Sequence, residues 1–213
     1  MCGRYTLVDI KSVRRRFGIE EDSAEFQASL NITPGTDQPV VIEKDTKRII
    51  QPMRWGLVPH WAQDAKIGYR LINARAETVA EKPAFRKPIA TNRCLIPANG
   101  FYEWQKQTQK KKPYYFSLEK NELMAFAGIW DMWENPTGEL LSTYSILTRS
   151  ADAVVAPIHD RMPLILNQDQ ESEWLNPLTP FETIRRVLES KNQIPLRASE
   201  ITVPLQTLAI KSS

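Results

Sequence analysis

The sequence has few of the residues that cross-link a small domain or hold a metal. Its 213 residues include two cysteines and two histidines, and Cys2, His60, Cys94 and His159 lie too far apart for a zinc-binding pattern. Two cysteines cannot make a disulfide scaffold. No apolar run approaches the roughly 20 residues of a transmembrane helix, and the N-terminus lacks the apolar stretch of a secretory signal. We therefore expect a soluble, cytoplasmic protein without a metal centre.

Glycine is also scarce, with 8 residues against 15 prolines, and both types are scattered along the chain. This distribution favours many short elements over long helices. Ile10, Val13 and Phe17 recur at helical spacing between Asp9, a candidate N-cap, and Gly18, a candidate stop. The pattern predicts a short amphipathic helix over 10–17, and two further segments, 168–175 and 181–190, are also expected to be helical.

Apolar runs bounded by turn residues predict strands along the middle of the chain, at 40–43, 49–57, 94–104, 114–118, 123–130, 140–147 and 162–166. The short polar turn between 114–118 and 123–130 predicts that these two strands form a hairpin, with 140–147 as a neighbouring strand. Strands linked by short turns, with helices at the ends, are typical of an α+β fold. We expect one domain over 1–213, with a curved, mostly antiparallel, barrel-like β core and flanking helices.

The net charge of +3 hides an uneven distribution of charge along the chain. Residues 44–120 hold 16 Lys and Arg against 6 Asp and Glu, a net charge of +10, whereas 1–43 and 121–213 carry −2 and −5. Such an asymmetry indicates a polyanionic partner, of which nucleic acid is the commonest. The alternative is a solvated basic face, because Lys110, Lys111 and Lys112 fall in a polar run, 105–112, that is typical of an exposed hairpin loop.

Cys2 is the most suggestive residue of the sequence. Removal of the initiator Met1 would give Cys2 an α-amine and a thiol on adjacent carbons, with ordinary pKa values of about 7.7–8.0 and 8.5. Such a 1,2-aminothiol condenses with an aldehyde, because the amine forms a Schiff base and the sulfur then closes a thiazolidine ring. Position alone equally allows Cys2 to be a small residue that leads into a strand.

Two further motifs contain polar groups suited to catalysis. In the segment 73–78, Asn73 offers an amide that both donates and accepts, and Arg75 offers a fork suited to phosphate, although a polar strand-to-helix junction would explain the same residues. In the aromatic run 100–104, strand alternation sends Phe101 and Glu103 to one face. Burial of Glu103 among aromatic residues would raise its pKa and suit it to general acid–base catalysis.

The two histidines lie in different contexts. His159, next to Asp160, has the chemistry for proton transfer near neutral pH, or is a hydrogen-bonded structural residue. His60 precedes Trp61 in a segment that starts at Trp55, and we interpret this segment as packing or as a base-stacking surface, since aromatic residues among positive charges bind single strands. Trp130, Trp133 and Trp174 lie outside the basic segment and are expected in the core.

These motifs together resemble the SRAP family, the SOS response-associated peptidases that sense abasic sites in single-stranded DNA. Any one motif is weak evidence, but seven in the same order are specific. The matching residues are 1–5, Asn31 with Pro34, 55–57 with Pro59 and Trp61, 73–78, 100–104, 126–130 and 159–163. The resemblance implies a mixed, curved β core with a positively charged groove, and no metal or organic cofactor.

The resemblance also implies roles for individual residues. Cys2, exposed by removal of Met1, would bond covalently to the aldehyde of a ring-opened abasic deoxyribose and so shield the lesion from strand cleavage. Asn73 would hold the Cys2 amine or the sugar, Glu103 would act as a proton shuttle, and His159 would assist ring opening. The expected DNA contacts are Arg4, Arg75, Arg86, Arg161, Trp55, Trp61 and Trp104. The expected partner is single-stranded DNA with abasic sites, bound by a monomer.

Two other functions remain open at this point. An N-terminal-nucleophile peptidase or amidohydrolase would use Cys2 with its own amine as base, and glutamine amidotransferases share the start Met-Cys-Gly. They lack the motifs at 100–104 and 159–163, and their reaction does not need a segment of charge +10. A non-covalent reader of single-stranded DNA would make Cys2 incidental. Cys94 is interpreted as a buried structural thiol.

Overall fold

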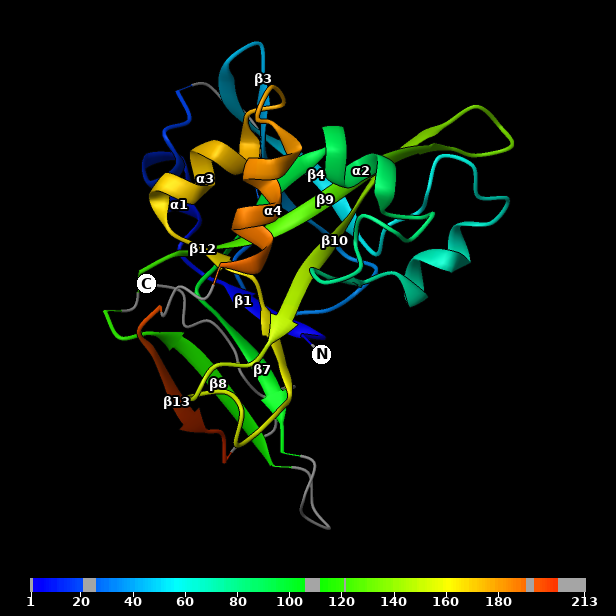
Figure 1. The fold of residues 1–213 in the computed structure, drawn as a ribbon. Helices are drawn as coiled ribbons and strands as arrows, with labels where there is room; N and C mark the ends of the chain where they lie inside the picture. Colours follow the sequence, from blue (N-terminus) through cyan, green and yellow to red (C-terminus); the bar gives the residue numbers. More distant parts are fainter. Residues whose placement is uncertain (1, 21–25, 106–111, 121, 191–193, 203–213) are drawn as a thin grey trace.

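The structure is a computed structural model that describes residues 2–20, 26–105, 112–120, 122–190 and 194–202. Most of the loop predicted over 105–112, with Lys110 and Lys111, lies outside these described residues. Strands predominate, and the longest of them run through the middle of the molecule (Figure 1).

Five strands close a barrel. Around the ring, β10 pairs with β4, β4 with β3, β3 with β6, β6 with β9, and β9 again with β10. The bounds are β3 (Asp37–Lys44), β4 (Lys47–Trp55), β6 (Arg93–Ala98), β9 (Met124–Glu134) and β10 (Leu140–Ser150). The apolar runs of β3, β6 and β9 are largely buried, as expected of strands that face the interior of a closed barrel.

Three short strands extend this barrel: β5 (Asn73–Arg75), β11 (Arg161–Pro163) and β12 (Ile165–Leu166). Both β5 and β11 pair with β10, and β12 pairs with β9. Only the pairings of β4 and β5 with β10 are parallel among those described. The expected α+β fold with a curved, mostly antiparallel, barrel-like core is therefore confirmed.

A second, fully antiparallel sheet lies against the barrel. Its strand order is β13 (Leu196–Glu200), β8 (Pro113–Leu118), β7 (Gly100–Trp104), β1 (Arg4–Leu7) and β2 (Ser29–Ile32). Tyr5 of β1 joins the two sheets: its ring lies 5.2 Å from that of Trp55, and its hydroxyl lies 2.8 Å from that of Tyr144. One buried apolar cluster contains residues from both sheets.

The predicted hairpin of 114–118 with 123–130 is wrong. The first segment is β8, which pairs with β7 and β13, and the second is part of β9 in the barrel. The single run predicted over 94–104 is likewise two strands in different sheets. It divides at Asn99, whose backbone N–H donates to Thr6 and whose side chain accepts from Val8. These bonds to the N-terminal segment turn the chain out of the barrel and into the second sheet.

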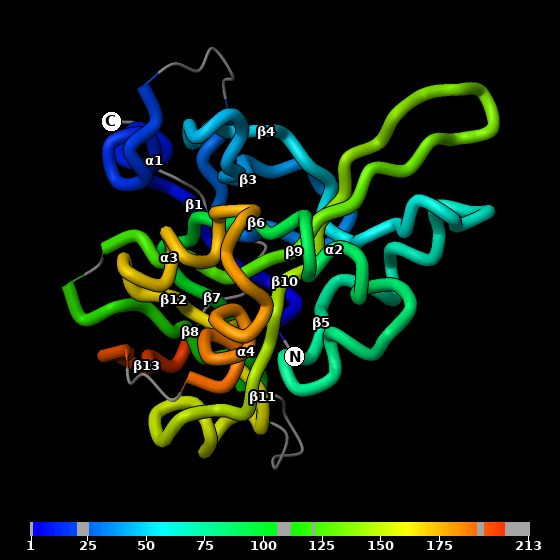
Figure 2. The backbone as a smooth tube through the Cα atoms, turned by 45° about the horizontal axis from the view of Figure 1, so that its top comes forward, coloured from blue at the N-terminus to red at the C-terminus, as the bar shows by residue number. Residues whose placement is uncertain are grey.

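The predicted helices are confirmed as α1 (Ile10–Phe17), α3 (Gln168–Leu175) and α4 (Phe181–Glu189), and the structure adds α2 (Arg86–Thr91) and the 3-10 helix η1 (Ala65–Arg70). Asp9 caps α1 by accepting from the Ser12 N–H, and Gly18 ends it in the left-handed conformation. In Figure 2, α3 and α4 lie over one side of the barrel strands. The guanidinium of Arg93 in β6 binds α2 and α3 to the barrel, because it donates to carbonyls at the ends of these two helices.

Gly100 offers a test of how closely β7 is packed between its neighbours. A Cβ atom there would lie 2.5 Å from the carbonyl oxygen of Phe116 and would overlap the ring of Tyr115. Gly100→Ala should therefore lower the free energy of unfolding by about 1–3 kcal/mol, as overpacking does, measured by urea denaturation. An unchanged midpoint would contradict the packing described for β7.

Candidate functional site

The four predicted catalytic residues come from four separate segments that meet at one end of the barrel. Cys2 lies two residues before the start of β1, Asn73 begins β5, and Glu103 lies in β7. His159 lies two residues before the start of β11. The pairing of β1 with β7 and of β5 and β11 with β10 brings these segments together. The four residues predicted from the sequence to act together therefore lie near one another in the structure.

Asn73 holds the main chain of Cys2. Its Nδ2 donates to the carbonyl oxygen of Cys2 at 2.8 Å. The Oδ1 of the same amide is buried and has no hydrogen-bond partner among the described residues. Because a buried polar atom without a partner is costly, this oxygen is a candidate acceptor for a hydroxyl or amine of a bound substrate.

The thiol of Cys2 is fully buried, and its Sγ lies 3.9 Å from the carbonyl oxygen of Arg4, to which it donates. Burial raises the pKa of this thiol far above its usual range, and the nearby carboxylate of Glu103 raises it further. The thiol is therefore neutral at physiological pH, and its attack on a substrate requires transfer of its proton to a base.

Glu103 and His159 form a buried pair of proton-transfer groups. The Oε2 atom of Glu103 lies 3.9 Å from Nε2 of His159, and both side chains are buried. The expectation that Glu103 is desolvated is confirmed. Nδ1 of His159 accepts from the backbone N–H of Arg161 at 2.9 Å, which places the proton of the neutral ring on Nε2. The carboxylate of Asp160 lies 3.1 Å from the same Nδ1.

Arg161 is engaged within the protein. Its guanidinium forms a two-pronged ion pair with Glu77, at 2.6 and 2.9 Å, and also donates to the carbonyl oxygen of Thr148. Only 12% of the Arg161 side chain is exposed. A phosphate contact by Arg161 would thus compete with Glu77. Sequence reasoning missed Glu77 and Thr148, although Glu77 lies in the motif 73–78.

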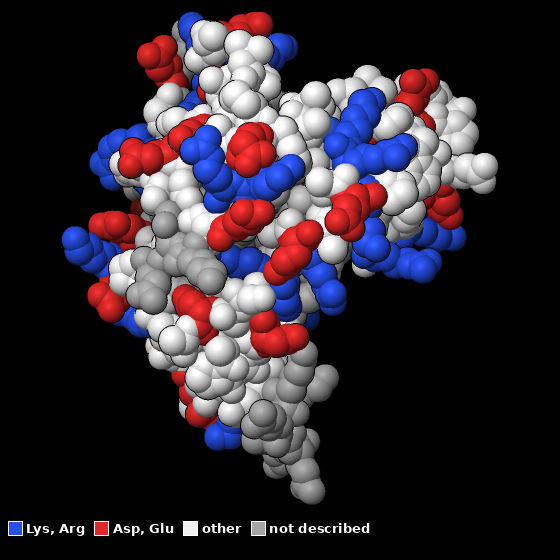
Figure 3. Space-filling model, viewed as in Figure 1, with Lys and Arg blue, Asp and Glu red and all other residues white. Residues whose placement is uncertain are grey.

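The other predicted arginines differ in their surroundings. Arg75 is exposed in β5, opposite Thr148 of β10, two residues beyond Asn73. Arg4 is half-buried, and its guanidinium donates to the side chain of Asn31. Arg86 is exposed at the start of α2, which packs on β6 and β9. Figure 3 shows Lys and Arg side chains grouped over the α2 and η1 region, with acidic side chains between them.

The prediction that Trp55 stacks on DNA is wrong. Its side chain is 1% exposed, its ring stacks on Tyr144, and its Nε1 donates to the carbonyl oxygen of Ile72. Trp61, by contrast, is 53% exposed, and Trp104 is partly exposed at the end of β7. Spacing along the chain did not distinguish a core tryptophan from surface ones.

Three further predictions are decided by burial. Cys94 is buried in β6, as expected of a structural thiol. Of the three tryptophans expected in the core, Trp174 and Trp133 are buried, whereas Trp130 is partly buried against it. His60 is exposed, and both its backbone N–H and its Nδ1 bond the buried carboxylate of Asp131, at 2.9 and 3.0 Å. Asp131 was not foreseen, and it holds the loop that presents Trp61.

The described residues contain no group of three or more His, Cys, Asp or Glu placed to hold a metal ion. None of the described helices has the length and apolar character needed to cross a membrane.

Together, the barrel and this site define a class of protein in which a cysteine at position 2 lies near an amide, a carboxylate and an imidazole. The sequence model of the SOS response associated peptidase (SRAP) family matches residues 1–205, and the chain belongs to this family. It is 43% identical over 181 residues to abasic site processing protein YoqW of Bacillus subtilis, covering 83% of this chain and 81% of YoqW. It is 36% identical over 202 residues to abasic site processing protein HMCES of Mus musculus, covering 76% of this chain and 57% of HMCES.

The fold is also found in solved structures. A crystal structure of a protein from Bacteroides thetaiotaomicron superposes with a TM-score of 0.84 at 30% identity, covering 94% of this chain and 92% of the other. A protein from Bordetella bronchiseptica superposes with a TM-score of 0.81 at 26% identity, covering 95% and 100%. The arrangement of barrel and second sheet is thus shared with proteins that are 26–30% identical to this chain.

The ion pair between Glu77 and Arg161 should make the protein more stable at neutral than at acidic pH. The hydrogen bond from Arg161 lowers the pKa of Glu77. A carboxylate whose folded pKa is lowered stabilises the fold above its unfolded value of about 4.3, and this contribution is lost as pH falls through the folded pKa. Glu77→Gln should therefore lower the free energy of unfolding at neutral pH, and its difference from the parent should shrink toward about pH 3.

Urea denaturation at a series of pH values measures this difference. Glu81→Gln, at an exposed position in the same segment, is the matched control and should show a smaller difference at neutral pH. A loss in Glu77→Gln that is the same at neutral and acidic pH would contradict the assignment.

Proposed function

We propose that the protein recognises abasic sites in single-stranded DNA and bonds to them covalently through Cys2 after removal of Met1. The observation that carries the proposal is the convergence of a buried Cys2 with Asn73, Glu103 and His159 at one end of the barrel. The names of the relatives YoqW and HMCES, both abasic site processing proteins, support the same substrate.

The reaction needs both nucleophiles of Cys2. The α-amine adds to the aldehyde carbon of the ring-opened deoxyribose, and loss of water gives a Schiff base. The sulfur then bonds to the same carbon, and the thiol proton passes to the nitrogen as the carbon–nitrogen double bond becomes single. The product is a thiazolidine, and one water is released overall. Since both nucleophiles belong to one residue, the second step is intramolecular and gains from proximity.

The environment of Cys2 favours this order of steps. Burial keeps the thiol neutral, whereas an α-amine with an ordinary pKa of about 7.7–8.0 is partly neutral and nucleophilic near pH 7. The amine therefore attacks first. The same burial argues against a peptidase that begins with attack by a thiolate, the alternative that the sequence left open.

The neighbouring groups take defined parts in this reaction. Asn73 fixes the main chain of Cys2, and with it the nitrogen that becomes the α-amine. Glu103 accepts and returns protons as the carbinolamine loses water and the thiol adds. His159, with a proton on Nε2, assists opening of the sugar ring. Ring closure removes the iminium that would otherwise promote β-elimination, and so protects the strand from cleavage.

The DNA would be held by the exposed basic and aromatic side chains around the site. Arg75 follows Asn73 by two residues and is exposed, so that it suits a phosphate beside the lesion. Arg4 lies on β1 next to Cys2, and Trp61 offers an exposed ring for stacking on an unpaired base. Arg86 and Trp104 are further contacts that we propose on exposure alone.

Substitution of Cys2 tests the chemistry. Cys2→Ala with Met1 removed should abolish the crosslink to single-stranded DNA that contains one abasic site, because the thiol is lost and the Schiff base is left reversible. Cys2→Ser should still form a Schiff base but shift the outcome toward strand cleavage. Denaturing gels with labelled DNA measure both products.

Cys94→Ala is the matched control, since Cys94 is the only other cysteine of the sequence and is buried in the barrel. It should retain the crosslink. A crosslink that survives Cys2→Ala, or an equally stable and uncleaved adduct with Cys2→Ser, would contradict the proposal.

A further inference from the structure

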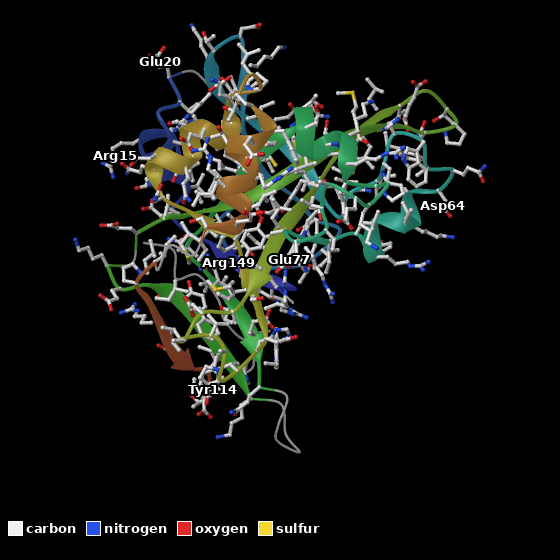
Figure 4. All side chains as sticks on the ribbon, viewed as in Figure 1. Arg15, Glu20, Asp64, Glu77, Tyr114 and Arg149 are labelled. Atoms are coloured by element: carbon white, nitrogen blue, oxygen red, sulfur yellow. The ribbon has the colours of Figure 1, made fainter. Side chains whose placement is uncertain are left out.

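The ion pair between Glu77 and Arg161 joins two segments of the site that are far apart in sequence. Glu77 follows β5, and Arg161 begins β11, on the two sides of β10. The two terminal nitrogens of the Arg161 guanidinium donate to the two carboxylate oxygens of Glu77, at 2.6 and 2.9 Å. Figure 4 shows Glu77 beside the β10 ribbon, close to the labelled Arg149.

The carbonyl oxygen of Thr148 in β10 strengthens this junction. It accepts from the guanidinium of Arg161 and also from the backbone N–H of Ala76, next to Glu77. Arg161 is thus fixed at its side chain by Glu77 and Thr148, and at its backbone by pairing with Ser150. With both its side chain and its backbone held, Arg161 presents its backbone N–H in a defined direction.

That N–H is the donor to the ring of His159. It lies 2.9 Å from Nδ1, whereas Nε2 of the ring faces the carboxylate of Glu103 at 3.9 Å. A nitrogen that accepts a hydrogen bond carries no proton, so the neutral ring has its proton on Nε2. This is the tautomer that can give a proton on the side of the ring that faces Glu103.

A second group competes for the same nitrogen. The carboxylate of Asp160 lies 3.1 Å from Nδ1 and would favour a proton there, which is the opposite tautomer. Asp160 is 73% exposed, so solvent weakens its influence, whereas the N–H of Arg161 is held in place. The balance between the two tautomers then depends on how firmly Arg161 is held.

We propose that the Glu77–Arg161 ion pair is a positioning device that holds the His159 ring in the tautomer with its proton on Nε2. The proposal rests on the function proposed above only for its effect on DNA, since the tautomer itself is a property of the free protein. Glu77 acts through Arg161 and is a positioning residue. When the pair is broken, Asp160 takes Nδ1–H as its donor and the ring loses its proton on the side of Glu103.

The tautomer is measured directly by long-range proton–nitrogen NMR correlation of the two imidazole rings, at about pH 8, where a histidine with the ordinary pKa of about 6.5 is neutral. The sequence has only two histidines, so that His60 serves as an internal reference. The parent should show His159 with an unprotonated Nδ1. Glu77→Gln and Arg161→Lys should each shift the ring toward a protonated Nδ1, while Glu81→Gln should leave it unchanged.

The effect on DNA is measured with the same proteins, with Met1 removed, by single-turnover crosslinking to an abasic site. Glu77→Gln should slow the covalent step by about tenfold, a part of the roughly 10²- to 10⁴-fold contributed by a positioned proton donor or acceptor. The affinity for intact single-stranded DNA should not fall, because Glu77→Gln removes a competitor for the Arg161 guanidinium and none of the proposed DNA contacts. Glu81→Gln should crosslink at the parental rate.

The NMR and crosslinking experiments test separate parts of the proposal. An unchanged tautomer in both Glu77→Gln and Arg161→Lys would overturn the proposal, whatever happens with DNA. A changed tautomer with an unchanged crosslinking rate would overturn its link to catalysis. If the parent itself formed no crosslink, the proposed function would fail, and the NMR result would still decide whether the ion pair positions His159.

Discussion

The backbone pairing of β10 is the constraint on which the rest of the site depends. At Thr148 this strand pairs with Arg75 of β5 on one side and with Pro163 of β11 on the other. The same strand closes the barrel through β9 and β4. Asn73 and His159, which are 86 positions apart in the sequence, reach the same end of the barrel because both flank this one strand.

The other half of the site depends on the joining of two sheets. Glu103 belongs to the second sheet, and Cys2 lies just before β1 of the same sheet. Tyr5 joins that sheet to the barrel by packing on Trp55 and hydrogen-bonding with Tyr144. Burial at this junction keeps the thiol of Cys2 neutral. A buried thiol that is unreactive toward solvent but close to a carboxylate suits a reaction in which an amine attacks first and sulfur second.

Patterns of neighbouring residues in the sequence correctly predicted features that depend on neighbouring residues, such as helix ends and burial. Asp9 and Gly18 marked the ends of α1, and the apolar surroundings of Glu103 indicated its burial. The partner of a strand depends on residues that are distant in the sequence. The sequences of β8 and β9 are typical of a hairpin, but β8 pairs with β7 and β13 in the second sheet. Trp55 was assigned to the surface for a related reason, since its contact with Tyr144 joins residues 89 positions apart. The motifs themselves located the four central residues, whereas the partners Glu77, Thr148 and Asp131 became visible only in three dimensions.

The central claim is that both nucleophiles of Cys2 are used in one adduct, and the intact mass of that adduct tests it most directly. The mass should equal that of the protein without Met1 plus the abasic oligonucleotide, less one water. After denaturation without reductant, thiol alkylation should add one group, on Cys94, because the sequence has two cysteines and the sulfur of Cys2 is already bonded. An adduct that takes up two alkyl groups, or that retains Met1, would contradict the account.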